Sequence, residues 1–200
     1  MAADRSVEFF EAQFRRQIAA NEFALNGFEL AALDFTRGRV LDFGCGLGNL
    51  SIEAARRGAA VVAVDASPTA TRRIRELAAR DHLHLDTICA DGKTHVIHGE
   101  HDTVIAIGLL MFFERRTAVE ILGRLAKAVA PAGRLIVNVL VEGTTFMAMF
   151  DPEEHYLFRL GELEELLPGW KILLRRDERF EAPGNTQKVF TTIVAERQHA

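Results

Sequence analysis

The six residues from Ala59 to Val64 are all apolar, three of them are valine, and Asp65 follows them directly. A strand that alternates apolar and polar residues covers one face of a sheet, whereas a strand that is apolar at every residue is buried on both faces. Such a strand needs helices above and below it. The run therefore predicts a strand inside a mostly parallel sheet that is covered on both sides.

The rest of the chain alternates between the two periodicities. Further strands are expected at 39–43, 84–90, 101–107, 134–141, 170–176 and 188–195, and helices at 6–33 (with a break near Asn26-Gly27), 49–57, 68–80, 114–129 and 158–167. Pro131 and Gly133 are expected to end a helix before the fifth strand. Pro183-Gly184-Asn185 predicts a hairpin between the last two strands. The fold class is therefore α/β, a doubly wound sheet with an antiparallel C-terminal strand.

Length, charge and cysteine content bound the function. The chain has 200 residues, a formal net charge of −4 and two cysteines. This length indicates one domain, and the acidic balance argues against nucleic acid or an anionic membrane as a partner. Two cysteines cannot build a disulfide framework, and the N-terminus lacks the basic and apolar regions of a signal peptide. We therefore expect a cytoplasmic protein.

Glycine and aspartate follow the predicted strands. Gly44–Gly48 follows the first strand, Asp65 ends the second, Asp91-Gly92 ends the third, and Gly108–Phe112 follows the fourth. Because ligands on open parallel sheets bind outside the carboxyl ends of the strands, these four segments are expected to share one rim. The glycines allow a ligand close to the backbone, and Asp65 is placed to accept both hydroxyls of a ribose. Asp91 could accept from an adenine amine or form an Asx-turn with Gly92. Together they predict a nucleoside site.

The glycine spacing is G-x-G-x-G, which differs from the G-x-G-x-x-G of dinucleotide folds. Four segments resemble the motifs of class I S-adenosylmethionine-dependent methyltransferases, namely 40–48, 64–68, 90–92 and 130–135. The resemblance covers about residues 39–141. It implies a Rossmann-like, seven-stranded sheet with a reversed seventh strand, S-adenosyl-L-methionine as cofactor and S-adenosyl-L-homocysteine as product.

The resemblance also implies the residues that hold the cofactor. They are Asp42, Gly44, Cys45, Gly46, Gly48, Asp65, Ala66, Ser67, Asp91, Gly92, Ile107 and Gly108. Gly44 and Gly46 would lie against the methionine part, Asp65 would hold the ribose, and Asp91 would face the adenine. Within the domain over 1–200, we expect a helical lid at 1–36, the cofactor-binding core at 37–141, and a substrate loop and C-terminal hairpin at 142–200.

Within this family, segments 108–114 and 158–170 are most similar to tellurite-resistance methyltransferases. Those proteins carry a His-Arg pair and another arginine in the last hairpin, which suit an oxyanion. In this chain, Lys188 is the only cation in residues 180–188. The acceptor class therefore stays open between a soft nucleophile, such as a thiol or chalcogen oxyanion, and a hydroxyl or amine.

Candidate acceptor residues lie outside the motifs. Phe14, Arg15, Met111, Phe112 and Phe146 are candidates for a substrate chamber, with ordinary core packing as the alternative for the aromatic residues. His155 follows the fifth strand and is the candidate general base. The other histidines are interpreted as surface residues and no metal site is expected, while Cys45 is interpreted as a packing residue rather than a nucleophile.

The sequence thus predicts an enzyme that acts on a small molecule, without nucleic-acid or membrane partners, as a monomer or homodimer. Two other functions remain open at this stage. One is a nicotinamide-dependent oxidoreductase, which the glycine spacing and the absence of a Ser/Tyr/Lys set around Tyr156 disfavour. The other is a non-catalytic module that binds S-adenosylmethionine and regulates another process.

Overall fold

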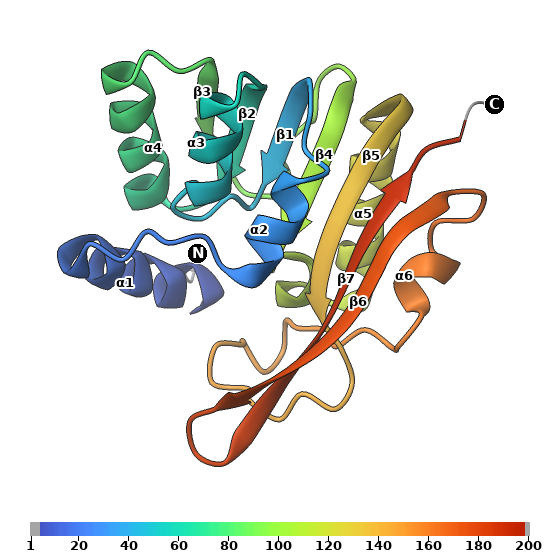
Figure 1. Ribbon diagram of the computed structural model, residues 1–200. Coiled ribbons are helices and arrows are strands. Elements are labelled where there is room, and N and C mark those ends of the chain that lie inside the picture. Colours follow the sequence, from blue (N-terminus) through green and yellow to red (C-terminus); the bar gives the residue numbers. More distant parts are fainter. Residues whose placement is uncertain (1–4, 199–200) are drawn as a thin grey trace.

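The computed structural model describes residues 5–198 (Figure 1). Its seven strands form one sheet in the order β3-β2-β1-β4-β5-β7-β6. The strands are β1 (Arg39–Phe43), β2 (Ala60–Asp65), β3 (Leu85–Cys89), β4 (His101–Ile107), β5 (Val129–Leu140), β6 (Lys171–Ala182) and β7 (Thr186–Glu196). Strands β1 to β5 are parallel, and β7 runs antiparallel to both β5 and β6. The predicted fold class is confirmed.

Helices cover both faces of this sheet, as the apolar run predicts. They are α1 (Arg5–Ala20), α2 (Gly27–Leu33), α3 (Asn49–Arg56), α4 (Pro68–Arg80), α5 (Arg115–Lys127) and the short α6 (Glu162–Glu165), with a 3-10 turn η1 at Leu110–Phe112. Neighbouring strand residues belong to opposite cores: Val104 packs in the core that contains α5, and Ile105 packs in the core that contains α3 and α4. Both side chains are fully buried. This two-faced burial holds the strand ends in place for a ligand.

The start of β5 and the helix before β6 differ from the sequence predictions. Pro131 and Gly133 lie inside β5, where the pairing with β4 shifts register. This bulge accommodates the proline. Position 133 requires glycine, because a Cβ there would lie 2.8 Å from the Ala130 carbonyl oxygen. The predicted helix over 158–167 shrinks to α6. Phe158 instead pairs with the end of β5: its N–H donates to the Leu140 oxygen at 3.2 Å.

Two peripheral segments reach beyond the carboxyl ends of the strands. Helix α1 lies across these ends, and the hairpin of β6 and β7 slopes past them on the other side (Figure 1). The hairpin is longer than predicted, since its strands begin or end up to six residues outside the expected 170–176 and 188–195. Residues 1–4 of the expected lid lie outside the described part of the chain. The two segments thus flank the edge of the sheet at which the parallel strands end.

Candidate active site

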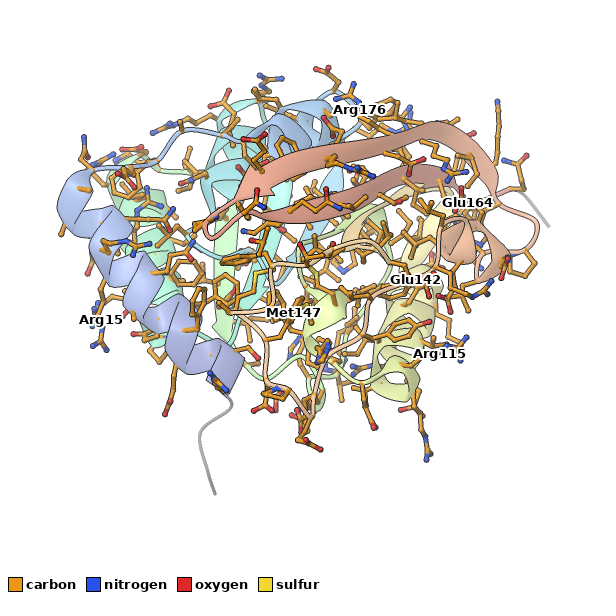
Figure 2. The ribbon with its side chains drawn as sticks, turned by 90° about the horizontal axis from the view of Figure 1, so that it is seen from below. Arg15, Arg115, Glu142, Met147, Glu164 and Arg176 are labelled. Atoms are coloured by element: carbon orange, nitrogen blue, oxygen red, sulfur yellow. The ribbon has the colours of Figure 1, made fainter. Side chains whose placement is uncertain are left out.

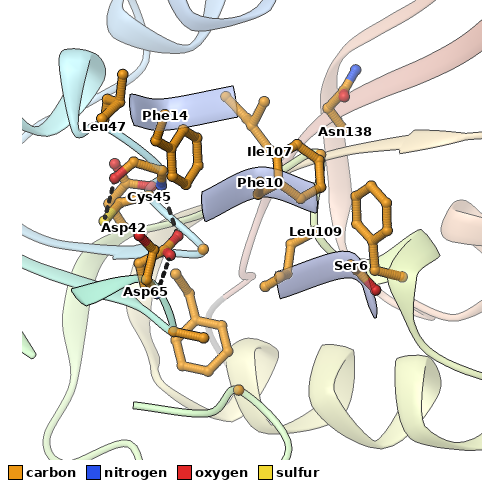
Figure 3. A pocket seen from close by; sticks show the side chains of 18 of the residues that line it. Ser6, Phe10, Phe14, Asp42, Cys45, Leu47, Asp65, Ile107, Leu109 and Asn138 are labelled. Carbon is orange, nitrogen blue, oxygen red and sulfur yellow. Dashed lines mark hydrogen bonds between the residues drawn. The ribbon is translucent and has the colours of Figure 1, made fainter. Parts of the chain in front are cut away.

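A cavity of about 590 Å³ opens at the carboxyl ends of the parallel strands (Figure 3). All four strand-end segments that the sequence predicts on one rim contribute to its wall. Residues of α1, α2, α3, β5 and β7 also line the wall. Its volume lies within the ~300–1,000 Å³ range of small-molecule sites. The cavity is therefore large enough to hold a small-molecule ligand.

The glycine loop closes tightly onto β2. Gly44, Gly46 and Gly48 have φ angles of 77°, 53° and 70°, which side chains rarely adopt. The Gly44 N–H donates to the Val64 oxygen at 2.7 Å. A Cβ on Gly46 would lie 3.3 Å from the Phe14 ring of α1, whereas one on Gly48 would lie 2.5 Å from Ile74 of α4. Gly46 thus keeps backbone exposed in the cavity, while Gly48 permits helix packing and is not part of the wall.

Asp65 organises the same loop from the end of β2. Its Oδ2 accepts from the Gly46 N–H and its Oδ1 from the Ser67 N–H, both at 2.8 Å. Burial raises the pKa of Asp65, and these two hydrogen bonds oppose the rise. Each carboxylate oxygen has a second acceptor position. The carboxylate can therefore accept hydrogen bonds from a ligand while it holds the loop.

Asp42 is the most perturbed carboxyl of the cavity wall. It is 4% exposed, and its Oδ2 accepts from the Ser51 hydroxyl at 2.6 Å. Burial raises its pKa to about 7, and the nearby carboxylates of Glu29 and Asp65 contribute to the rise. The same burial raises the pKa of the Cys45 thiol well above its usual range. Cys45 therefore stays a thiol near neutral pH, which agrees with its interpretation as a packing residue.

The other strand ends supply backbone and one more carboxylate. Asp91 forms the Asx-turn that the sequence left open, because its Oδ1 accepts from the Lys93 N–H at 2.8 Å. Arg124 of α5 donates to the Gly92 oxygen at 2.6 Å. The Gly108 N–H donates to the Asn138 oxygen at 3.0 Å. Of the twelve residues expected to hold the cofactor, eleven line the cavity and Gly48 does not.

Helix α1 is held against the cofactor-side loop by one carboxylate. Glu11 accepts hydrogen bonds from the hydroxyls of Ser67 and Thr69 at the start of α4. Burial alone would raise the pKa of Glu11, but these bonds and Arg15 lower it overall. Phe10 and Phe14, which flank Glu11, both line the cavity. Sequence patterns do not predict this role of Glu11, because its partners lie more than fifty residues away along the chain.

The candidate acceptor residues divide into two groups. Phe14, Met111 and Phe112 line the cavity. Arg15 does not: its side chain is 71% exposed and points to solvent (Figure 2), where it pairs with Glu11 at 3.2 Å. Phe146 packs outside the wall, beside Lys188.

His155 also lies outside the cavity wall. Its ring stacks on Phe150 at 5.1 Å, and its Nδ1 is 3.0 Å from the Asp151 oxygen. The wall also contains residues that sequence patterns did not single out for the site, among them Phe28, Asn138 and Phe190, and it contains Lys188, which the sequence analysis noted only as the single cation of the last hairpin. These four residues lie on α2, β5 or β7, and only the fold brings these elements together.

Within residues 5–198, no three His, Cys, Asp or Glu side chains are grouped to hold a metal ion. The same part of the chain contains no helix with the length and apolarity that a membrane crossing requires. Among the described residues, the cavity wall contains carboxylates, backbone groups, aromatic rings and one lysine.

Comparisons with known proteins agree with this geometry. Residues 40–133 match a family described as "Methyltransferase domain". The mitochondrial ubiquinone biosynthesis O-methyltransferase of Schizosaccharomyces pombe is 35% identical over 115 residues, which is 53% of this chain and 39% of that enzyme. The chain thus spans well under half the length of that relative.

Two solved structures share the fold. TehB from Haemophilus influenzae superposes with a TM-score of 0.76 at 20% identity, over 91% of this chain and 65% of that one. The N-methyltransferase NodS from Bradyrhizobium japonicum, in complex with S-adenosyl-L-homocysteine, superposes with a TM-score of 0.71 at 14% identity, over 98% and 100%. The match over residues 40–133 and the shared fold support the resemblance to class I S-adenosylmethionine-dependent methyltransferases that the sequence motifs indicate.

Proposed function

We propose that this protein transfers a methyl group from S-adenosyl-L-methionine to a small-molecule acceptor. The observation that carries the proposal is the meeting of the glycine loop, Asp65 and Asp91 on one cavity at the strand ends. The similarity to methyltransferases supports it, and so does the bound S-adenosyl-L-homocysteine in NodS. No membrane or nucleic-acid partner is part of the proposal.

The charge of the cavity favours this cofactor over a dinucleotide. Asp42, Asp65 and Asp91 line the strand-end side, and Lys188 is the only cationic side chain among the described wall residues. S-adenosylmethionine carries a sulfonium and an ammonium, which a carboxylate-lined site attracts. A dinucleotide would place its pyrophosphate against these carboxylates, where like charges repel. This contrast disfavours the nicotinamide alternative.

The residues present fit the parts of the cofactor. Asp65 would hold the ribose hydroxyls, Asp91 would face the adenine, and Gly44 and Gly46 would let the methionine part approach the backbone. When bound, the cofactor supplies an activated methyl on sulfur. The protein then has to orient the acceptor and exclude water, and the aromatic rings of α1 provide an apolar cover.

The chemistry of the nucleophile divides the candidate acceptors. A thiol or chalcogen oxyanion needs little acid-base help, whereas a hydroxyl or amine must lose a proton. His155, the candidate base, would have to move from its stack on Phe150 to reach the cavity. The proposal therefore assigns no base to this chain, and a hydroxyl or amine acceptor would release its proton to solvent. We place the reaction in the cytoplasm.

Calorimetric titration with S-adenosylmethionine, S-adenosylhomocysteine and NADH tests the cofactor. We expect micromolar binding of both sulfur nucleosides and none of NADH. NADH binding alone would replace the proposal with the oxidoreductase. A second assay follows the formation of S-adenosylhomocysteine with thiols, phenols, amines and chalcogen oxyanions, and absence of turnover with all of them would favour the regulatory module.

A further inference from the structure

Lys188 is an unpaired cation in the cavity wall. It lies on β7, lines the cavity, and burial lowers its pKa. Its Nζ lies over the Phe146 ring, 4.6 Å from the ring centroid, in a cation–π contact. No described carboxylate forms an ion pair with it. A half-buried ammonium without an anionic partner loses hydration without full compensation, and a ligand anion would restore it.

A second unpaired polar group lies on the same face of the sheet. Asn138 is 1% exposed and lines the cavity. Its Nδ2 donates to the Thr192 hydroxyl at 2.9 Å, but its Oδ1 has no hydrogen-bond partner. Nearly all buried polar atoms are hydrogen-bonded, so a free buried acceptor at a cavity indicates a donor on the ligand.

The register of β5 and β7 relates the two groups. Thr192 pairs with Asn138 and Phe190 pairs with Leu140. Because side chains alternate along a strand, Lys188, Phe190 and Thr192 share one face. Four residues of strand separate the Lys188 backbone from that of Thr192 by about 13 Å. Lys188 and Asn138 thus mark two ends of one wall.

The wall between these ends is apolar. Phe190 packs with Phe28 at a centroid distance of 4.7 Å, and Phe112 packs with Phe10 at 5.0 Å. Met111 and Met149 complete this part of the cavity. Such a surface favours a hydrophobic ligand body, with polar groups only at its two ends.

We propose that the methyl acceptor is an elongated apolar monocarboxylic acid. Its carboxylate binds the Lys188 ammonium, and its hydroxyl or amino group donates to Asn138 Oδ1. As the oxygen or nitrogen forms its bond to the methyl, the methyl–sulfur bond breaks, S-adenosylhomocysteine leaves, and the proton passes to solvent, because an amide oxygen cannot hold it. A phosphate is disfavoured because it carries up to two charges, and the described wall offers one cation. The inference builds on the proposed function, since it names the substrate class of the same cavity.

Binding of 2-naphthoate and its neutral analogue 2-naphthamide tests the role of Lys188. Affinities are measured by calorimetry on the protein alone and on the protein saturated with S-adenosylhomocysteine. We expect the acid to bind about tenfold more tightly than the amide, as for a charge-assisted hydrogen bond. The preference should vanish in Lys188→Met and persist in Lys188→Arg. Lys171→Met, an exposed control on β6, should behave as the wild type.

Three outcomes would overturn the inference: equal binding of acid and amide by the wild type, a preference that survives in Lys188→Met, or tighter binding of 2-naphthyl phosphate than of 2-naphthoate. The comparison of acid and amide on the protein alone does not depend on S-adenosylhomocysteine. Failure of S-adenosylhomocysteine to bind would refute the proposed function, and the comparison on the protein alone would still test the role of Lys188. For Asn138, 6-hydroxy-2-naphthoate should bind the wild type more tightly than 2-naphthoate. Asn138→Leu should remove that gain, and no gain in the wild type would refute the Asn138 contact.

Discussion

The two halves of the cavity are built in different ways. The strand-end half consists of the glycine loop and short segments after β2, β3 and β4, and it is lined by carboxylates and backbone. The other half consists of α1, α2, η1 and the hairpin strand β7, and it is lined mainly by aromatic rings and methionine. The first half suits one cationic nucleoside, and the second suits an apolar acceptor.

This difference shows how a common fold can serve different acceptors. The strand-end half depends on buried strands such as β1 and β4, so few substitutions there leave the sheet intact. The acceptor half lies on elements outside the parallel core, where side chains can change without disturbing β1 to β4. Function is therefore determined by the site rather than by the fold.

The most severe test of the strand-end half is Gly46→Val. Position 46 has φ 53°, and a side chain there would meet Phe14 and occupy the space where a ligand approaches the loop. We expect S-adenosylhomocysteine binding to fall below detection in calorimetry. Gly58→Val is the matched control, because Gly58 also has a positive φ (92°) but no atom near its Cβ and no place in the cavity wall. Near-normal binding by Gly46→Val would remove the loop from the site.

Asp65→Ala tests the proposed ribose contact in the same half. It removes the acceptor proposed for the ribose together with the two bonds that Asp65 accepts from Gly46 and Ser67. We expect the affinity for S-adenosylhomocysteine to weaken by about 1–3 kcal/mol. Asp65→Asn, which keeps one acceptor oxygen, should fall between the wild type and Asp65→Ala. Unchanged affinity in both variants would show that Asp65 does not contact the cofactor.

Sequence patterns predict the two halves unequally. Strands 39–43 and 101–107 match β1 and β4 to the residue, because each is a short, largely apolar segment that ends directly before a glycine, Gly44 or Gly108. The residues after these strands follow from topology, since parallel strands present their carboxyl ends at one edge. Most of the strand-end half could therefore be predicted before the structure was known.

The acceptor half could not be predicted in the same way. Glu11 meets Ser67, and Asn138 of β5 meets Thr192 of β7, so their roles depend on contacts between distant segments. Lys188 reaches the same wall only because β7 pairs with β5. His155 illustrates the converse: its position after β5 favours the rim, yet local packing on Phe150 keeps it out of the cavity wall. The spacing of residues along the chain does not carry this information.

Asp42→Asn tests the electrostatic cost of the strand-end half. A carboxyl whose pKa is about 7 when folded binds its proton more tightly in the folded state than in the unfolded chain, where its pKa is near 3.8. Its contribution to stability is therefore greatest at low pH and falls as the pH rises from about 4 to 7, by up to about 1.4 kcal/mol per pH unit.

Asparagine cannot ionise, so Asp42→Asn should gain stability relative to the wild type as the pH rises through this window. Urea unfolding at pH 5, 6, 7 and 8 measures the difference. Asp86→Asn, the same substitution at an exposed residue of β3, serves as the control. Parallel curves for the wild type and Asp42→Asn would mean that Asp42 titrates alike in both states.

The smallest expected effect concerns the connection between the halves. Glu11 holds α1, and with it Phe10 and Phe14, against the start of α4 beside Asp65. Glu11→Gln keeps the shape of the side chain but removes the charge from both hydrogen bonds. We expect the closed position of α1 to lose about 1 kcal/mol of stabilisation, which corresponds to S-adenosylhomocysteine dissociating about fivefold faster. Stopped-flow displacement measures this rate. Glu8→Gln, an exposed substitution on the same helix, should leave the rate unchanged. If Glu11→Gln also leaves it unchanged, the aromatic cover does not depend on this carboxylate, and the two halves of the cavity act independently.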